Sequence, residues 1–408
     1  MEIDVAAAGW RNHGHLGNPE FSGVILRVIW EGELRRKEED WPPVMTLKDR
    51  LDSPLGPLSL ELGNTPLGDL PGHLTGVCAA PLSAVSPELL QELLLPAAQN
   101  RLSQKAARIT ARARQSGWEQ SLWEALFRAL GYKRNEWPMH CVAEALPRLL
   151  QPGDDVIRLQ SRLLGVAGLL PSEPPKRSRR AREYWHQLWD HWWREREALR
   201  PLLLPSRAWR QNAQRPANHP QRRLALAAHW LMRPEFFVSL ENWFRQDYPK
   251  SQLDTSLVRV LCPEKDRFWS RHWSLGSRCQ EAAAPLLGVP RATDLAMNAI
   301  LPWFWARAST SANHQSARVR AEYRYYQWPT GQDNAVLRLA RKRLLGNRPR
   351  REFGSEALNQ GLLQIVRDFC SLSNAACEDC PFPQMLRRFM ASREQPLQHP
   401  HENPNAPK

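Results

Sequence analysis

From about residue 86 onward, apolar residues recur every three to four positions, the spacing that places them on one face of an α-helix. Ser86-Pro87-Glu88 opens the first such segment with a capping serine and a proline in the first turn. The pattern predicts helices over 86–115, 117–131, 137–150, 154–169, 183–199, 219–231, 235–247, 278–287, 292–307, 333–345 and 355–370. We therefore expect a mainly α-helical protein with a multi-helical body.

The first 85 residues follow a different pattern. Residues 24–30 are a short, mostly apolar run with β-branched side chains, which is typical of a buried strand. Residues 59–62 are a second candidate strand, and glycine and proline separate the pieces. These features predict a small N-terminal unit of α+β character over residues 1–85.

Two segments divide the remainder of the chain. Residues 171–182 are proline-rich and then strongly basic, which predicts an exposed linker. The last segment contains four prolines and is expected to be disordered. The predicted organisation is a β-rich unit over 1–85, a helical domain over 86–170, the basic linker over 171–182, a helical domain over 183–391 and a tail over 392–408.

Composition adds a class of partner. The formal net charge is +14, arginine greatly outnumbers lysine, and there are 18 tryptophans. An arginine-rich, basic chain favours a polyanionic partner such as nucleic acid, although a GC-rich genome produces the same enrichment. No apolar run reaches the roughly 20 residues of a membrane span, so no membrane partner is expected. Seven cysteines, mostly isolated, indicate a reducing cytoplasm rather than a disulfide framework.

Three cysteines form the motif most suggestive of defined chemistry. Cys370, Cys377 and Cys380 follow the pattern Cys-x6-Cys-x2-Cys-Pro, in which thiolates can converge on Zn²⁺ or an iron–sulfur cluster. A complete site needs a fourth ligand, and no cysteine follows Cys380. A distant histidine or a water could complete the site; alternatively, the thiols simply pack. The four other cysteines are interpreted as buried small apolar residues: Cys78, Cys141, Cys262 and Cys279.

The spacing of the triplet is similar to the first three ligands of the iron–sulfur loop in endonuclease-III-like DNA glycosylases. In those enzymes a fourth cysteine follows, where this chain has Leu386. Residues 288–293 are only a faint counterpart of the helix–hairpin–helix that those enzymes need. The sequence therefore argues against glycosylase chemistry.

Two arginine-rich segments are the candidates for phosphate contact. They contain Lys176, Arg177, Arg179, Arg180 and Arg182, and Arg215, Arg222 and Arg223. The second segment leads into a helix that Pro220 begins, with Asn218 or His219 as its cap, and a helix N-terminus attracts phosphate. The alternatives are a solvated surface run for the first segment and buried arginines that tie helices together for the second. Tryptophans at helical spacing between residues 185 and 193 favour core packing over base stacking.

A pair of histidines near the N-terminus is a further candidate metal site. His13 and His15 alternate before a predicted strand, so both side chains can point to one side, with Glu2 or Asp4 as additional ligands. Paired loop histidines are more often hydrogen-bonded surface residues.

Several strings together resemble an uncharacterised bacterial family known as domain of unknown function 2851 (DUF2851). They lie at residues 10–30, 101–109, 118–135, 164–170, 215–225 and 298–302 and at the cysteine triplet. The resemblance implies a common fold and no established activity.

Relatives in that family typically carry an upstream segment similar to the catalytic core of restriction-endonuclease-like nucleases, in which an Asp and a Glu hold Mg²⁺. This chain begins inside the corresponding strand, as Met1-Glu2-Ile3-Asp4-Val5-Ala6, and only Glu2 matches. The expectation is either a misassigned start or a remnant without nuclease activity. The leading hypothesis is therefore a nucleic-acid-binding protein without catalysis. The alternatives are a helical scaffold for another protein and a metal-dependent enzyme of unknown reaction that uses His13 and His15.

Overall fold

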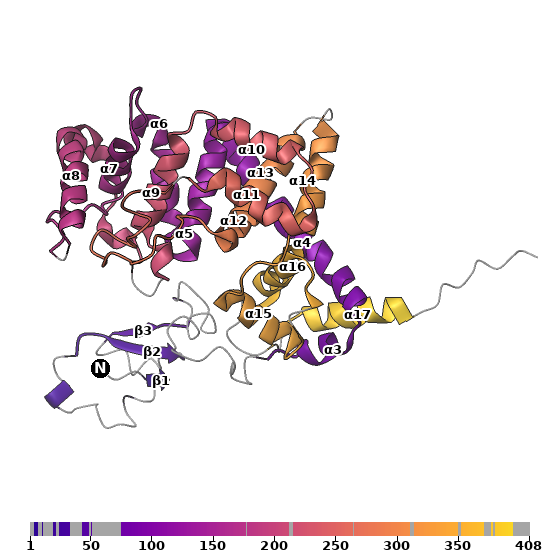
Figure 1. Ribbon diagram of the computed structural model, residues 1–408. Helices are drawn as coiled ribbons and strands as arrows, with labels where there is room; N and C mark the ends of the chain where they lie inside the picture. The colour runs from indigo at the N-terminus through magenta and orange to yellow at the C-terminus, as the bar shows by residue number, and fades with distance from the viewer. Residues whose placement is uncertain are drawn as a thin grey trace, which may run out of the picture. The chain divides into compact units, whose positions relative to one another are not determined.

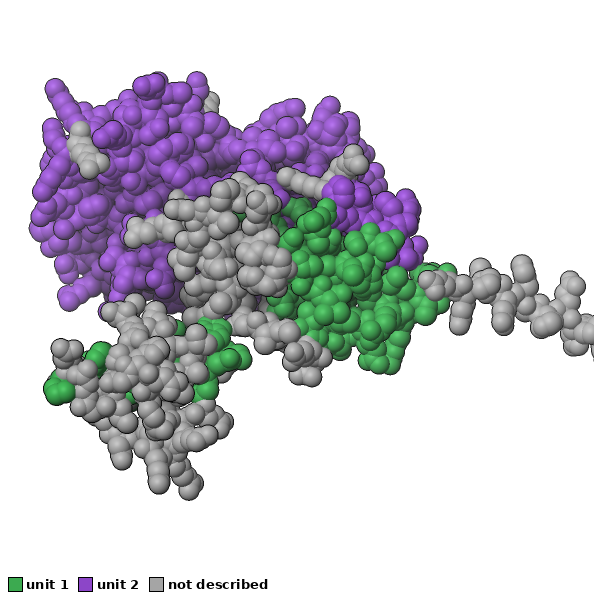
Figure 2. Space-filling view, turned by 90° about the horizontal axis from the view of Figure 1, so that it is seen from below, with its two compact units in different colours: residues 1–84, 338–347, 365–408 green, residues 85–337, 348–364 purple. Residues whose placement is uncertain are grey.

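The computed structural model describes residues 4–6, 10, 19–21, 24–32, 43–48, 50, 75–176, 178–211, 215–263, 265–310, 314–349, 352–370, 377 and 380–394. These residues are mainly α-helical with one small sheet, which confirms the predicted fold class (Figure 1). The chain forms two compact units (Figure 2). Unit 1 comprises residues 1–84, 338–347 and 365–408, and unit 2 comprises residues 85–337 and 348–364. The units do not follow the order of the chain, whereas the predicted domains do.

Unit 1 contains the sheet and a small group of helices. The sheet consists of β1 (Asp4–Ala6), β2 (Arg27–Glu31) and β3 (Val44–Thr46), all parallel and in that order. β2 overlaps the predicted strand at 24–30, whereas the candidate strand at 59–62 lies outside the described residues. The helical segments are η1 (Pro19–Phe21), α3 (Ala79–Ala84), most of α15 (Ala335–Leu345), the π-helical η11 (Val366–Cys370) and α17 (Phe382–Glu394).

Unit 2 contains helices joined by loops, and no strand occurs among its described residues. Its α-helices are α4 (Pro87–Ser116), α5 (Trp118–Glu144), α6 (Leu146–Leu149), α7 (Val156–Val166), α8 (Arg179–Leu199), α9 (Pro220–Leu231), α10 (Phe236–Arg245), α11 (Leu253–Leu261), α12 (Val289–Leu295), α13 (Leu301–Ala308), α14 (Gln315–Gln327) and α16 (Glu356–Ile365), the last residue of which belongs to unit 1. The π-helical η8 (Ala296–Ile300) joins α12 to α13, and single 3₁₀ turns occur at η4 (Arg200–Leu202), η5 (Ser206–Ala208), η6 (Pro216–Asn218) and η7 (Lys250–Gln252). In Figure 1, α8 lies towards one end of this unit and α14 towards the other.

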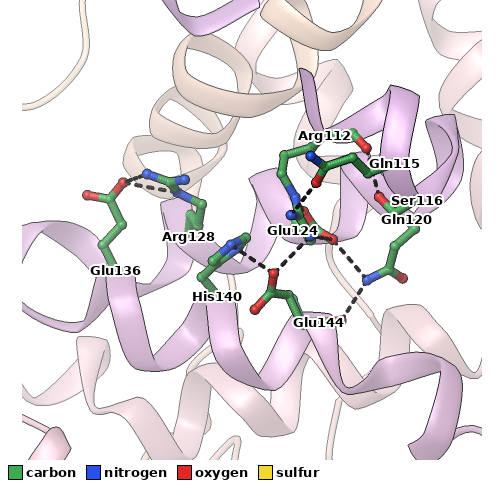
Figure 3. A network of polar contacts seen from close by, with 10 residues as sticks. Arg112, Gln115, Ser116, Gln120, Glu124, Arg128, Glu136, His140 and Glu144 are labelled. Atoms are coloured by element: carbon green, nitrogen blue, oxygen red, sulfur yellow. Dashed lines mark hydrogen bonds and ion pairs between the residues drawn. The ribbon is translucent and has the colours of Figure 1, made fainter. Parts of the chain in front are cut away.

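The start of α4 shows how local sequence determines a helix. The Ser86 side chain accepts a hydrogen bond from the Leu89 backbone N–H, and Pro87 occupies the first turn, as the sequence predicts. The predicted helix at 117–131 and the first part of the one at 137–150 are joined as α5, which is kinked where Tyr132 has a φ of 52°; the remainder of the second forms α6. Arg128 pairs with Glu136 across this kink (Figure 3).

Several predictions of secondary structure are wrong. Residues 278–287 are not helical; their backbone instead bonds to an adjacent loop, as in the 2.7 Å hydrogen bond from Ala284 N–H to the Ser270 carbonyl. Pro285 lacks the N–H that a helix interior needs. Conversely, the sequence predicts no helix over the residues of α11, α14 and α17. The buried face of α14 contains Arg324, which hides the expected apolar pattern.

Most of the large core side chains are aromatic. Trp230, Trp243, Trp269, Trp303 and Trp328 are among the largest fully buried side chains. Their indole N–H groups find acceptors, as in the 2.9 Å bond from Trp303 to the Trp118 carbonyl, so the rings can be buried without loss of a hydrogen bond. Trp185 and Trp192 of α8 are also buried, which supports core packing for these members of the predicted aromatic face.

Ion pairs between arginines and carboxylates connect the helices of unit 2. Arg112 of α4 binds Glu124 at 2.6 Å and Glu144 at 2.8 Å, which ties α4 to both halves of α5 (Figure 3). Arg162 of α7 is wholly buried and pairs with Asp154, at 2.6 Å, and with Glu195 of α8. A guanidinium removed from water requires such partners.

Replacement of Arg162 by leucine should strongly destabilise the protein, because the buried Asp154 loses its 2.6 Å partner and keeps only the more distant Arg158, at 3.8 Å. We expect a loss of about 3–5 kcal/mol in the free energy of unfolding, measured by urea denaturation. The matched control is Arg179→Leu, which breaks only an exposed ion pair with Glu183 and should cost less than about 1 kcal/mol. Equal losses for the two variants would contradict the role assigned to Arg162.

Candidate functional site

The N-terminus of α8 combines a capped helix end with exposed positive charge. Ser178 caps the helix by accepting a hydrogen bond from the Ala181 N–H at 3.3 Å. The first turn contains Arg179, Arg180 and Arg182 and no acidic residue. Helices normally place acids here, because the helix dipole is positive at this end. Three arginines here are repelled by the positive end of the dipole and so reduce the stability of the helix. An anion bound at this end would instead be attracted both by the dipole and by the guanidinium groups.

The arginines at this helix end are exposed and reinforced by a neighbouring loop. Arg179 is paired with Glu183 at 2.8 Å, but its side chain is 88% exposed, so the pair contributes little and is readily exchanged. Arg180 donates a hydrogen bond to the Arg267 carbonyl, which brings a fourth exposed arginine next to the helix end. We define the α8 basic surface as Lys176, Arg179, Arg180, Arg182 and Arg267. The predicted Arg177 lies outside the described residues.

The second predicted arginine segment is an internal corner. Arg222 is 1% exposed and donates to the carbonyls of Trp269, at 3.1 Å, and Pro285, at 2.9 Å. Arg223 is 3% exposed and donates to the Leu286 carbonyl at 2.9 Å.

Burial lowers the pKa of both corner guanidinium groups to about 10. These two arginines fit the alternative of buried arginines that tie helices together, and they have no free face for a phosphate. Arg215 is exposed and donates to Gln332 at 3.2 Å.

His219 provides the cap of α9. Its Nδ1 accepts a hydrogen bond from the Gln221 N–H at 3.4 Å, in agreement with one of the two predicted caps. Burial lowers the pKa of His219 to about 4, because no acid compensates for the lost hydration of its charged form. The cap therefore requires the neutral imidazole.

Sequence reasoning missed a buried polar cluster between α4, α16 and η8. Lys105 donates to Gln360, at 2.9 Å, and to the Met297 carbonyl, at 3.0 Å. Burial lowers the pKa of Lys105 well below its usual value and raises the pKa of Glu356 and of Asp294. Such shifts mark candidate functional sites. The satisfied hydrogen bonds of Lys105 favour a bracing role here, and its i, i+4 spacing from Arg101 was the available signal in the sequence.

The cysteine triplet lies in unit 1. Cys370 ends η11, and Cys377 and Cys380 precede α17, with a 3.4 Å hydrogen bond from the Cys380 N–H to the Cys377 carbonyl. Cys78, at the start of α3, belongs to the same unit and is 4% exposed. Of the four cysteines predicted to be buried, only Cys78 is; Cys141 and Cys262 are partly buried, and Cys279 is exposed.

Among the described residues, no three His, Cys, Asp or Glu side chains are arranged so that they could hold a metal ion. His13 and His15 lie outside those residues, as does Glu2. Within the same ranges, no helix has both the length and the apolar character needed to cross a membrane.

The chain was compared with known protein families, curated proteins and solved structures. The model of a family described as a protein of unknown function (DUF2851) matches residues 1–328 of the 408-residue chain. The chain belongs to the DUF2851 family. The match includes the α8 basic surface and the corner of Arg222 and Arg223, and it stops before the cysteine triplet. No curated protein and no solved structure matches the chain significantly. Membership of DUF2851 thus agrees with the resemblance seen in the sequence. Because the function of the family is unknown, any function has to be argued from the site itself.

For this DUF2851 protein we expect stability to fall as the pH is lowered from about 6.5 towards about 4, because unfolded chains protonate His219 in that range while the native state does not. Urea midpoints at about pH 7 and about pH 5 measure the effect. His219→Asn keeps a capping side chain but cannot titrate, so its midpoint should shift less between the two pH values. An unchanged pH shift in the variant would show that the native His219 titrates normally.

Proposed function

We propose that this DUF2851 protein binds nucleic acid through the α8 basic surface. The observation that carries the proposal is the exposed arginine cluster at residues 179–182, in the first turn of a capped helix. Phosphate is the common anion that benefits from a helix N-terminus and from forked guanidinium donors together. Because a nucleic acid carries a phosphate on every nucleotide, one strand can contact several adjacent cations at once.

The geometry of α8 extends this surface along the helix. Trp193 is 54% exposed, and the Arg196 guanidinium lies 3.5 Å from its ring centroid. Trp193 lies eleven positions after Arg182, so it returns to nearly the same helix face about 16 Å further along the axis. One face of α8 therefore presents cations at its start and an exposed ring paired with a cation further on.

The expected binding is independent of base sequence. Phosphate contacts fix the position of a nucleic acid without reading its bases, and their strength depends on release of counterions. The net charge of +14 adds long-range attraction of a polyanion to the whole chain. Absence of binding at low salt would remove this proposal and favour the scaffold hypothesis.

The direct test measures binding of labelled single- and double-stranded DNA and RNA by fluorescence anisotropy at about 50 and about 200 mM salt. The full-length chain should lose affinity steeply between these conditions. The variant Arg179→Ala/Arg180→Ala/Arg182→Ala should bind at least about ten-fold more weakly, and its salt slope should fall by about 2–3.

Arg245→Ala is the matched control. Arg245 is an exposed arginine on α10, paired with Glu241 at 3.1 Å, and its loss should leave affinity and salt slope nearly unchanged. The triple variant should also unfold no more readily than the original, because three cations leave the positive end of a helix dipole. Equal affinity of triple variant and control would locate any binding elsewhere.

A further inference from the structure

Three tryptophan rings form a row along α8. Trp185, Trp189 and Trp193 are four residues apart, so their side chains follow one another on the helix. The ring centroids of Trp185 and Trp189 are 5.1 Å apart with 15° between the ring planes. Those of Trp189 and Trp193 are 6.3 Å apart with 33° between the planes. Each ring of the row therefore lies next to the following one.

The row leads from the core to the solvent. Trp185 is 5% exposed and donates its indole N–H to the Pro171 carbonyl at 2.9 Å. Trp189 is partly buried, and Trp193 is 54% exposed. The Arg196 guanidinium lies over the Trp193 ring, 3.5 Å from its centroid, and adds a cation at the exposed end of the row. Core packing explains Trp185 but not this exposed end.

Cations lie at both ends of the row on the same helix face. Positions 182, 186, 189, 193, 196 and 200 are three or four residues apart and so share one face, about 27 Å long. Arg182 belongs to the α8 basic surface, and Arg200, whose side chain is 78% exposed, follows the last residue of α8. No acidic residue occupies these six positions; the acidic residues of α8 are Glu183, Asp190, Glu195 and Glu197.

We propose that the partner of this face is a single-stranded nucleic acid, with an unpaired base stacked against Trp193 and Arg196. The proposal rests on the nucleic-acid binding proposed above and adds the strandedness of the partner. Proteins that hold single strands combine cations that follow the phosphates with aromatic rings on which bases stack. An unpaired base offers a free face to a ring or a guanidinium, whereas the bases of a duplex are already stacked and paired with one another. The cations at the start of α8 would by themselves accept either form.

Exposure distinguishes this site from other aromatic groups of unit 2. Phe244 and Phe304 are stacked with their ring centroids 3.8 Å apart, but they are only 5% and 6% exposed. The Arg324 guanidinium lies 4.7 Å from the ring centroid of Trp243, and both side chains are buried. Neither group presents a surface to a base, whereas the end of the row on α8 does.

The test measures the binding of one labelled oligonucleotide in three forms by fluorescence anisotropy at about 50 mM salt. The forms are the single strand, its duplex, and a strand of equal length with abasic sites in place of the bases. The abasic strand keeps the phosphates, so comparison with it isolates stacking. The full-length chain should bind the single strand at least about ten-fold more tightly than the abasic strand, and more tightly than the duplex.

Trp193→Ala should bind the single strand about ten-fold more weakly than the original protein. Its affinity for the abasic strand and its salt slope should not change, because no phosphate contact is lost. Trp193→Phe keeps a ring and should recover most of the affinity. The matched control is Trp137→Ala, which removes an indole that is 61% exposed on α5 and should leave binding of all three forms unchanged. Urea midpoints verify that each variant is folded.

The outcomes separate this proposal from the one on which it rests. Equal affinity of the original protein for the single strand and the abasic strand, or tighter binding of the duplex, would overturn stacking on α8. Weaker binding by Arg179→Ala/Arg180→Ala/Arg182→Ala would in that case still support phosphate contact by the α8 basic surface. No binding of any form at low salt would overturn both proposals.

Discussion

The helical unit depends on one constraint: a guanidinium buried away from water must be surrounded by acceptors. In unit 2 many of these acceptors are backbone carbonyls. Arg324 of α14 donates to the carbonyls of Trp243 and Gln246, where α10 ends, and Arg320 donates to that of Arg245. Helix C-termini leave their last carbonyls without intrahelical partners, and the dipole there favours a cation. Arginine thus satisfies two needs with one side chain.

Because of the same constraint, the net positive charge of the chain overstates the number of cations available to bind a ligand. Arg162, Arg222 and Arg223 contribute to the positive charge of the chain but are committed to internal partners. Only cations outside this framework can meet a polyanion. Those at the start of α8 differ in kind, because they are exposed and oppose the helix dipole. Since these arginines lower the stability of α8, binding of an anionic ligand explains their presence better than a role in folding does.

Local pattern predicted local structure well. The serine cap and proline of α4, the long helices and β2 follow from spacing and turn chemistry within a few residues. Features that depend on distant partners did not follow. Nothing near Arg222 reveals that its acceptors are carbonyls of residues 269 and 285. The loop at 278–287 is another such case, since its backbone bonds to residues 270 and 271 rather than to itself.

The most direct test of the division between internal and exposed arginines is hydrogen–deuterium exchange with and without a DNA or RNA oligonucleotide at low salt. The account predicts slower exchange at residues 178–184 and around Arg267 when the oligonucleotide is bound, with no change in α9 around Arg222 and Arg223. Protection centred on α9, or protection spread over α10 and α14 with none at the start of α8, would contradict it.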